Sequence, residues 1–328
     1  MRMRNSNKGG FTLLELVVVL AILAVVTTLA MRSLDHVLDG KREETNRLAI
    51  EELRDAVLGS PDDHAADGTR TISGFVADMG RLPLAVEING DLTLAELWMD
   101  PGVRFDIRPA IPDHGVPAGF ADPQVLVAGG WRGPYLHLPM GSSQWMDGWG
   151  NPMITRLNNG GLNPVGEGYA RLRNIADEPL NSAGQEIRLV RHLGADGILD
   201  GTETGYNQDG FVMFGDSSVL SSVTAQVEVM DETDEDQPED IDPGYLVTLC
   251  VFHPDPADAS KIKVRTETVP FSSNPVVLPV IGDVPQGPRA VRGYLHPVAD
   301  AANSFRRSAV RNLVLRPGPN FVELRIDR

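Results

Sequence analysis

The feature that most constrains this sequence is an apolar run of twenty residues close to the N-terminus. Residues Phe11–Ala30 read FTLLELVVVLAILAVVTTLA, and neither proline nor glycine occurs from there to Asp39. Twenty residues of α-helix rise ~30 Å, which is about the thickness of the hydrocarbon core of a membrane. The run therefore predicts a helix that spans a membrane, with the rest of the chain on one side of it.

The residues in front of this run form a short basic leader that ends in two small residues. The leader reads MRMRNSNKGG, and the positive-inside rule keeps its basic side chains in the cytoplasm. A secretory signal peptide has its small residues after the apolar segment, whereas Gly9 and Gly10 come before it. Cleavage after Gly10 would therefore remove only the leader and make Phe11 the new N-terminus.

One acidic residue, Glu15, interrupts the apolar run. A carboxylate inside a membrane costs roughly 3 kcal/mol on insertion scales unless it is neutralised. Cleavage would create a free amine at Phe11, and in a stack of subunits Glu15 of one chain can pair with Phe11 of its neighbour. The alternative interpretation is a tolerated interfacial glutamate near a helix N-terminus, where the helix dipole favours an acid.

Together these residues resemble the type IV prepilin family. Residues Lys8–Glu15 read KGGFTLLE and are similar to the recognition motif of prepilin peptidase. The resemblance implies cleavage between Gly10 and Phe11, N-methylation of Phe11 and a charge-pairing role for Glu15 in assembly. It also implies a single-pass protein of the inner membrane with a cytoplasmic leader and a periplasmic head. An inner-membrane assembly platform and its ATPase would then draw the subunits into a periplasmic or extracellular filament.

The helix is expected to continue beyond the membrane. Apolar residues recur at roughly helical spacing as far as Val57, charged residues fill the other faces, and Gly59-Ser60-Pro61 ends the pattern. A helix over residues 12–58 would be ~70 Å long at 1.5 Å per residue. Its second half is expected to pack on a globular head.

Three short motifs after the helix carry a second resemblance. They are Gly133-Pro134-Tyr135-Leu136, Trp149-Gly150-Asn151-Pro152 and Leu193-Gly194-Ala195-Asp196-Gly197. Together they resemble the head of the major pseudopilins of type II secretion. The resemblance implies a calcium-binding loop with the Leu193 carbonyl, Asp196 and Asp209 as ligands. The second motif predicts a tight turn that anchors Trp149 in the core and holds the head together.

The composition of the third motif and the residues after it agrees with a structural calcium site. Calcium takes about six to eight oxygen ligands from carboxylates and carbonyls, and glycines let the backbone fold so that carbonyls converge. Asp200 and Glu203 add carboxylates to Asp196 and Asp209. The spacing does not fit an EF-hand, and an Asp/Gly-rich surface turn without metal is the alternative interpretation.

Beyond Ser221 the sequence changes character and predicts a small β-sandwich. The acidic segment Glu228–Asp242 is expected to be an exposed loop, with a second calcium site as the less favoured alternative. The candidate strands are Val223–Met230, Tyr245–His253, Lys261–Val269, Pro275–Ile281, Ala290–Leu295, Val310–Leu315 and Phe321–Ile326. The major pseudopilins have no comparable module, so major and minor subunit both remain open.

Composition excludes several other classes of protein. The net charge of -16, with 29 Lys and Arg against 45 Asp and Glu, argues against a nucleic-acid binder. A single cysteine, Cys250, excludes an intrachain disulfide and is expected to be a buried small apolar residue. The seven histidines show no metal-ligand spacing, and no nucleophile elbow, P-loop or Rossmann fingerprint occurs, so no enzyme is expected.

We therefore expect an α+β protein in four segments. They are a leader at 1–10, an N-terminal helix at 11–58 with 11–30 in the membrane or filament core, a pseudopilin-like head at 59–220 with an insert at 71–130, and a β-sandwich-like module at 221–328. The expected function is a structural subunit of a type II secretion-like pseudopilus or a type IV pilus-like filament. Its partners would be copies of itself in a helical homopolymer, other pilin-like subunits and prepilin peptidase. The alternative is a low-copy minor or tip pilin whose β module binds a ligand, a surface or a secreted substrate.

Overall fold

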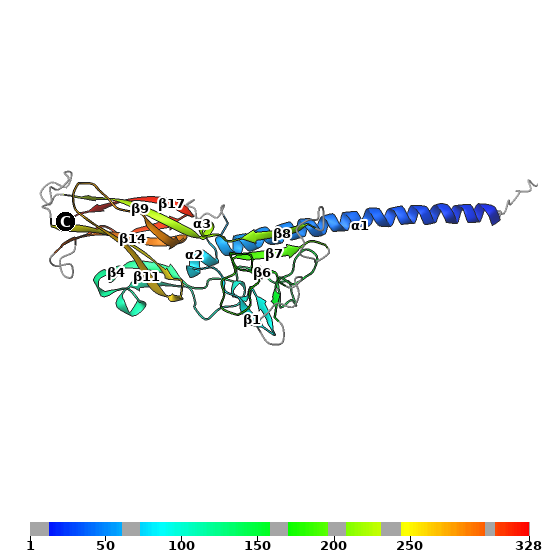
Figure 1. Ribbon diagram of the computed structural model, residues 1–328, viewed down its shortest axis with the longest axis horizontal. Coiled ribbons are helices and arrows are strands. Elements are labelled where there is room, and N and C mark those ends of the chain that lie inside the picture. Colours follow the sequence, from blue (N-terminus) through cyan, green and yellow to red (C-terminus); the bar gives the residue numbers. More distant parts are fainter. Residues whose placement is uncertain are drawn as a thin grey trace, which may run out of the picture.

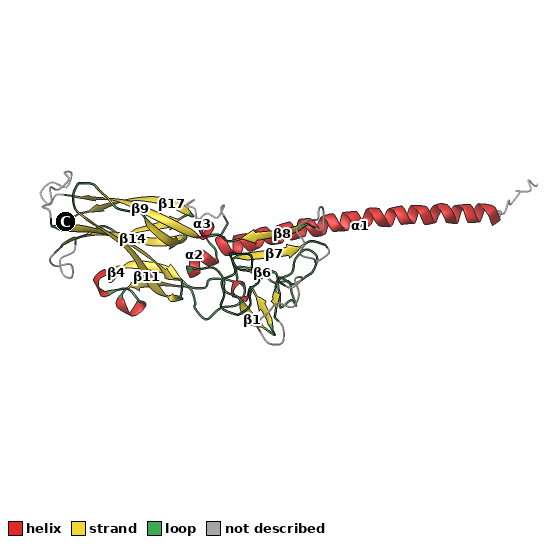
Figure 2. Ribbon diagram, viewed as in Figure 1, coloured by secondary structure: helices red, strands yellow, loops and turns green. Residues whose placement is uncertain are grey.

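A computed structural model describes residues 13–60, 73–157, 170–195, 208–230, 244–298 and 306–327. The molecule is elongated: a long helix projects from one end, a small head packs beside the last part of this helix, and a β-sandwich forms the other end (Figure 1). Coloured by secondary structure, the molecule is a helical shaft that joins a body made mostly of strands (Figure 2).

Helix α1 runs without interruption over Leu13–Leu58, a length of 46 residues or ~69 Å. This confirms the helix that the apolar run and the amphipathic pattern predict. Its N-terminal part is exposed, whereas Leu53 and Val57 near its end are fully buried in the head. Gly59, at a φ of 87°, donates its N–H to the Asp55 carbonyl at 2.8 Å and ends the helix, as expected for a glycine at this position.

The head consists of short elements around one apolar core that includes the last turns of α1. Its helices are α2 (Phe75–Met79) and the 3-10 helix η1 (Ala95–Leu97), and its strands are β1 (Val86–Ile88), β2 (Asp91–Thr93), β5 (Thr155–Arg156), β6 (Leu172–Arg173), β7 (Leu189–Leu193) and β8 (Asp209–Met213). The strands form two antiparallel sheets, β1-β2-β5 and β6-β7-β8. The sequence also predicts short helices within 71–84 and 93–98, and these are α2 and η1.

The β-sandwich follows the short helix α3 (Asp216–Val219) and has two sheets. Its strands are β9 (Leu220–Val229), β10 (Tyr245–Asp255), β11 (Asp258–Pro270), β12 (Val276–Val277), β13 (Ile281–Pro285), β14 (Gly287–Pro297), β15 (Arg306–Arg307), β16 (Arg311–Leu315) and β17 (Gly318–Ile326). One sheet has the order β11-β10-β14, with β15 and β16 on the other edge of β14. In the second sheet β9 pairs with β12 and β13 and, in parallel, with β17. Each candidate strand of the sequence overlaps one of these strands.

The sheet that contains β10 and β14 is covered on both faces. Its inner face packs on β9 and β17. Its outer face is covered by a hairpin of β3 (Asp106–Ala110) and β4 (Asp122–Gly129), with the 3-10 helices η2 (Pro112–His114) and η3 (Ala118–Phe120) between them. Cys250 lies in this outer layer and is buried, as predicted. Burial on both faces explains why Tyr245–Phe252 is almost continuously apolar.

The hairpin corrects one expectation. The Pro- and Gly-rich composition of residues 85–130 predicts an irregular segment, but β3 and β4 in this segment form a paired hairpin from Asp106 to Gly129. A buried acid on β4, Asp122, binds Arg292 of β14 and Arg307 of β15, the latter at 3.0 Å. These ion pairs and the apolar layer beneath depend on residues far away in the sequence, so the local pattern did not reveal the hairpin.

The head and the β-sandwich meet in a buried joint at α2. Asp78 of α2 is 2% exposed and accepts hydrogen bonds from Arg132 at 2.8 Å and from the Tyr135 hydroxyl at 2.9 Å. Tyr135 belongs to the Gly-Pro-Tyr-Leu motif, so this motif helps to form the joint. Arg289 of β14 donates to the carbonyl of Ala77, next to Asp78, at 3.0 Å.

The end of α1 belongs to the same joint. The buried side chain of Gln286 donates to the Leu58 carbonyl at 3.0 Å, which satisfies one of the free carbonyls at the helix C-terminus. Gly287 lies so close to α2 that an added Cβ would come within 2.7 Å of the Ala77 Cα. Backbone contact and hydrogen bonds therefore connect α1, the head and the β-sandwich directly.

The joint predicts a pH-dependent stability. Burial raises the pKa of Asp78 from its ordinary value of 3.8 to about 6, although Arg132 and Tyr135 act against this shift. Because the folded protein binds this proton more tightly than the unfolded chain, the free energy of unfolding falls as the pH rises from about 4 to about 6, by up to ~3 kcal/mol. We expect Asp78→Asn to remove this part of the pH dependence.

The measurement is denaturant unfolding of the detergent-solubilised protein between pH 4 and pH 7. Asp113→Asn, which changes an exposed aspartate, is the control and should keep the wild-type slope. The same slope in Asp78→Asn and in the wild type would show that this carboxyl titrates normally in the folded protein.

Candidate functional site

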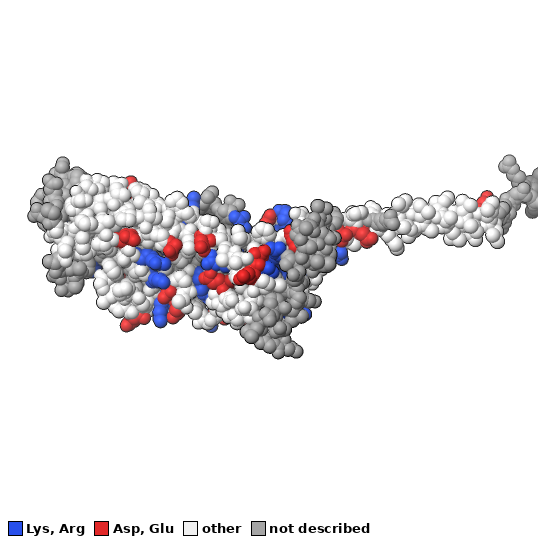
Figure 3. Space-filling view, viewed as in Figure 1, with Lys and Arg blue, Asp and Glu red and all other residues white. Residues whose placement is uncertain are grey.

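The first functional feature is the N-terminal part of α1, whose apolar side chains have no cover within the described residues. Its most apolar window of 18 residues has a mean hydropathy of 2.7 and is 0% buried, so it is no core helix. By length and composition it can cross a membrane. In a space-filling view it is an almost uncharged shaft beside the charged body (Figure 3). Thr27 and Thr28 donate their hydroxyls to the carbonyls of Leu23 and Ala24, which satisfies these polar groups inside the helix.

Glu15 lies in the first turn of α1, on the exposed surface of the helix. The predicted processing residues Gly10 and Phe11 lie outside the described residues. Pairing between Glu15 and a neighbour's Phe11 amine involves two chains, so it stays a prediction. The structure shows in addition that α1 runs as one uninterrupted helix from Glu15 to the head.

The head docks on the middle of α1 through the turn that contains the Trp-Gly-Asn-Pro motif. Gly148 lies against the helix backbone: an added Cβ would be 2.1 Å from the Arg42 carbonyl oxygen and 2.6 Å from the Asn46 nitrogen. The Gly148 N–H donates to the Oδ1 of the fully buried Asn46, at 3.5 Å. Only a residue without a side chain allows this contact.

The expectation for Trp149 is wrong in one respect. Trp149 is half-buried and lies under the Arg42 guanidinium, 5.7 Å from the ring centre, whereas Trp145 lies in the core. The reason is Gly148, which brings the turn onto the helix and leaves the indole on the helix surface. Behind the turn, Asp147 accepts a hydrogen bond from the buried Arg171 at 2.7 Å and from the Asn151 N–H at 2.7 Å. The motif therefore holds the head on α1.

The second functional feature is the loop between β7 and β8, which contains the predicted calcium ligands. Of these, the structure describes Leu193, which ends β7, and Asp209, which begins β8; Asp196, Asp200 and Glu203 lie outside the described residues. Leu193 and Asp209 are direct partners in the β7–β8 ladder, and both carboxylate oxygens of Asp209 are shielded from solvent. Within the described ranges, no three His, Cys, Asp or Glu side chains are grouped so that they could hold a metal ion.

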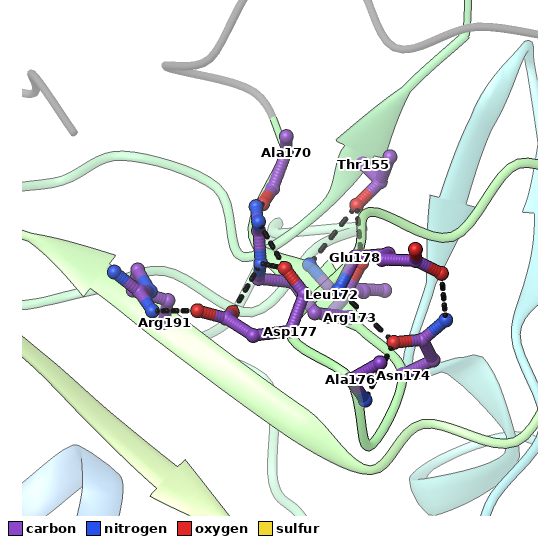
Figure 4. A network of polar contacts seen from close by, with 9 residues as sticks. All are labelled: Thr155, Ala170, Leu172, Arg173, Asn174, Ala176, Asp177, Glu178 and Arg191. Carbon is purple, nitrogen blue, oxygen red and sulfur yellow. Dashed lines mark hydrogen bonds and ion pairs between the residues drawn. The ribbon is translucent and has the colours of Figure 1, made fainter.

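A polar network braces the strand that leads into this loop (Figure 4). Asp177 accepts hydrogen bonds from Arg173 of β6 and from Arg191 of β7, both at 2.5 Å. The Asn174 side chain accepts from the backbone N–H groups of Ala176 and Glu178, which closes the turn that presents Asp177. The network fixes β7 two residues before Leu193. The sequence did not predict this network. Arg173 and Asp177 are four residues apart, but Arg191 is fourteen residues from Asp177 and comes close to it only in the folded sheet.

The comparisons with known proteins concern the N-terminus. Residues 5–31 match the family of the prokaryotic N-terminal methylation motif. Comparison with curated proteins and with solved structures gave no match to this chain. The match confirms the resemblance of the N-terminus to prepilins, while the resemblance of the head to pseudopilins stays a prediction.

A methylation motif followed by a long apolar helix has a general functional implication. It implies a type IV pilin-like protein that is processed by prepilin peptidase and anchored in a membrane by its N-terminal helix. It also implies assembly with other pilin-like subunits into filaments. The motif thus suggests a structural protein.

The docking turn gives a direct prediction. Gly148→Ala places a Cβ where the Arg42 carbonyl and Asn46 lie, so the turn must move away from α1. We expect the free energy of unfolding to fall by about 1–3 kcal/mol, the usual cost of overpacking. Urea unfolding monitored by tryptophan fluorescence measures this change. Gly119→Ala is the matched control, since nothing lies within 4 Å of its added Cβ; equal losses in both variants would contradict the prediction.

Proposed function

We propose that this protein is a structural filament subunit of a type II secretion-like pseudopilus or a type IV pilus-like filament. The observation that supports this function most is α1, which combines a methylation motif at its start with an apolar surface that is 0% buried. Lipid covers this surface in the membrane, and the helices of neighbouring subunits cover it in a filament. Assembly then exchanges one apolar environment for another and leaves the head outside the helical core.

Glu15 determines how neighbouring helices fit together in this proposal. Its carboxylate pairs with the Phe11 amine of the adjacent subunit, so both charges are neutralised in apolar surroundings. The pair also fixes the axial register between subunits. Because α1 continues unbroken into the head, this register sets the positions of the heads as well.

A minor or tip subunit is the second candidate, and the position of the β-sandwich favours it. The β-sandwich lies at the end of the molecule opposite the start of α1 (Figure 1) and directly beyond Leu58, which Gln286 contacts. In a filament of parallel helices, a module placed there extends toward the next subunits. At the tip no further subunit follows, so the module fits without steric conflict and its surface is free to bind a ligand, a surface or a secreted substrate.

We also propose a structural calcium ion in the loop between β7 and β8. The Leu193 carbonyl, Asp196 and Asp209 are the ligands, and Asp200 and Glu203 supply further carboxylates. The proposal is supported by the β7–β8 ladder, which holds Leu193 and Asp209 opposite each other, and by the bracing of β7 through Asp177. Calcium would tie the two ends of the loop together and stabilise the head.

The filament proposal is tested by Glu15→Ala. The variant should insert into the membrane and lose its leader normally but assemble poorly, because the neighbour's Phe11 amine is left unpaired in an apolar environment. Filament yield in the native host, by electron microscopy of sheared material, measures the effect against the amount of processed protein in the membrane. Glu52→Ala, an exposed glutamate on the same helix, is the control. Wild-type filament yield from Glu15→Ala would refute the pairing.

The copy number of the protein in purified filaments separates the two candidates. A chain that makes up most of the filament mass is the main structural subunit. A few copies beside another, abundant pilin-like subunit indicate a minor subunit, and immunogold labelling at one filament end indicates the tip.

The calcium proposal predicts that chelation lowers the melting temperature of the head. An ion at about 100 times its Kd stabilises the folded state by ~2.7 kcal/mol, which corresponds to a rise in Tm of about 5–11 °C for a unit of about 150–250 residues. Differential scanning calorimetry with EGTA and with added calcium measures the shift. Asp209→Asn should lose the response, and Asp106→Asn, which changes an exposed aspartate of the β3–β4 hairpin, should keep it. A wild-type melting curve that is unchanged by chelation, with no metal bound, would reject the site.

A further inference from the structure

A row of basic side chains crosses one end of the inner face of the β10 sheet. Lys263 of β11 lies directly opposite His253 of β10, and Arg265 lies opposite Val251, a residue of the inner core. Arg289 lies on the other side of His253, at the position that follows the last paired residues of β10 and β14. Directly opposed residues share a face of a sheet, with Cβ atoms about 4.5–5.5 Å apart. We call Lys263, His253, Arg289 and Arg265 the basic row.

The basic row has no carboxylate partner: among the described residues, none of its members forms an ion pair with an acid. Elsewhere in this protein the buried arginines are paired, such as Arg171 with Asp147 at 2.7 Å. Arg289 is buried, and among the described residues it donates only to backbone carbonyls, those of Ala77, Pro285, Gln286 and Pro288. The carboxylate of Asp78 acts on Arg289 through space, but its hydrogen bonds go to Arg132 and Tyr135.

His253 is the buried residue of the row whose ring nitrogen Nε2 has no hydrogen-bond partner among the described residues. It is 1% exposed, and its Nδ1 donates to the Pro254 carbonyl at 2.8 Å. Its Nε2 is buried and has no hydrogen bond to any described residue, and the same holds for the Nε of Arg265. Burial and the charges of Arg289, Arg265 and Lys263 lower the pKa of His253 to about 3, so its ring is neutral in the free protein. Buried polar atoms without a partner are rare, and a bound water or ion is one explanation for such an atom.

The row reaches solvent at the open edge of the β-sandwich. β11 is an edge strand of its sheet, Lys263 is exposed and Arg265 is half-buried. The strand of the second sheet that packs against β11 is β13, whose pairing with β9 is irregular between Ile281 and Val284. Asp283, the charged residue of β13 at this irregularity, is exposed. The row therefore extends from the buried His253 to exposed side chains at the edge strand β11.

We propose that the basic row binds a small oxyanion such as phosphate or sulfate. Lys263 and Arg265 contact the anion from the solvent side, with the Arg265 Nε as a donor. His253 takes up a proton from solvent on Nε2 and donates it in a hydrogen bond to an anion oxygen, while Arg289 contributes positive charge from behind. The anion supplies the counter-charge that no described acidic residue provides through an ion pair.

A purely structural role is the competing explanation. Charges that point inward from an edge strand discourage pairing with the edge of another sheet. In that case the row has no specific affinity for phosphate, and its variants respond to phosphate as the wild type does.

The test is thermal unfolding of the full-length protein in detergent, titrated with sodium phosphate, sodium sulfate or sodium chloride at equal ionic strength. We expect phosphate or sulfate to raise the Tm of the wild type above its value in chloride. The variant Lys263→Gln/Arg265→Gln should weaken the apparent Kd by about tenfold or more, as expected for the loss of charge-assisted hydrogen bonds. The control Arg311→Gln/Arg316→Gln removes the same charge from exposed positions in and directly after β16, at the opposite edge of the sheet from β11, and should keep the wild-type Kd.

A second measurement addresses His253. Calorimetric titration with phosphate in two buffers of different ionisation enthalpy should show proton uptake at pH 7 in the wild type and none in His253→Gln. If the double variant does not fold in chloride, Lys263→Gln alone, which changes an exposed side chain, replaces it and should weaken binding in the same direction. Equal effects of phosphate, sulfate and chloride on the wild-type Tm, or equal responses of the double variant and its control, would overturn the proposal.

Discussion

The rest of this structure depends on an apolar helix surface that the described part of the chain does not bury. The N-terminal part of α1 has a mean hydropathy of 2.7 over 18 residues and is 0% buried within the described residues. Burial of apolar surface is the main favourable term in folding and association, so such a helix needs lipid or other helices around it. Membrane insertion and filament assembly both cover the apolar surface of α1. The methylation motif at residues 5–31 is typical of proteins that do both in turn.

The body of the protein is organised around attachment to this helix. Gly148 brings a turn of the head onto the α1 backbone, and Gln286 of the β-sandwich binds its last carbonyl. Between them, Asp78 and Arg289 connect α2 to the 131–135 segment and to β14. The β-sandwich is therefore fixed to the rest of the molecule. Its residues Gln286 and Arg289 bind the end of α1 and the helix α2 of the head.

Local sequence patterns predicted some of these features and missed others, for a physical reason. Hydropathy and the glycine at position 59 were enough to predict α1, because a helix is specified by nearby residues. Alternating residues and turns were enough to predict most strands of the β-sandwich. The β3–β4 hairpin was missed because its buried face exists only when β10 and β14 lie beneath it. The bridge from Arg173 through Asp177 to Arg191 and the basic row were missed because strand pairing, and not sequence proximity, brings their members together. Trp149 was predicted in the core because its local pattern does not show that the neighbouring Gly148 packs on α1. This packing directs the indole onto the surface of α1.

Because α1 is continuous, a small change in its angle at the turn around Gly148 moves the distant end of the helix by a large distance. From Arg42, which Gly148 touches, to Glu15 the helix extends about 40 Å at 1.5 Å per residue. A tilt of about 5° at this turn would displace the Glu15 end by about 3.5 Å over this length, as much as the length of an ion pair. How precisely Gly148 fixes the angle of α1 thus determines how precisely the Glu15 carboxylate is positioned. The close contact between the Gly148 backbone and the helix is where that precision is set.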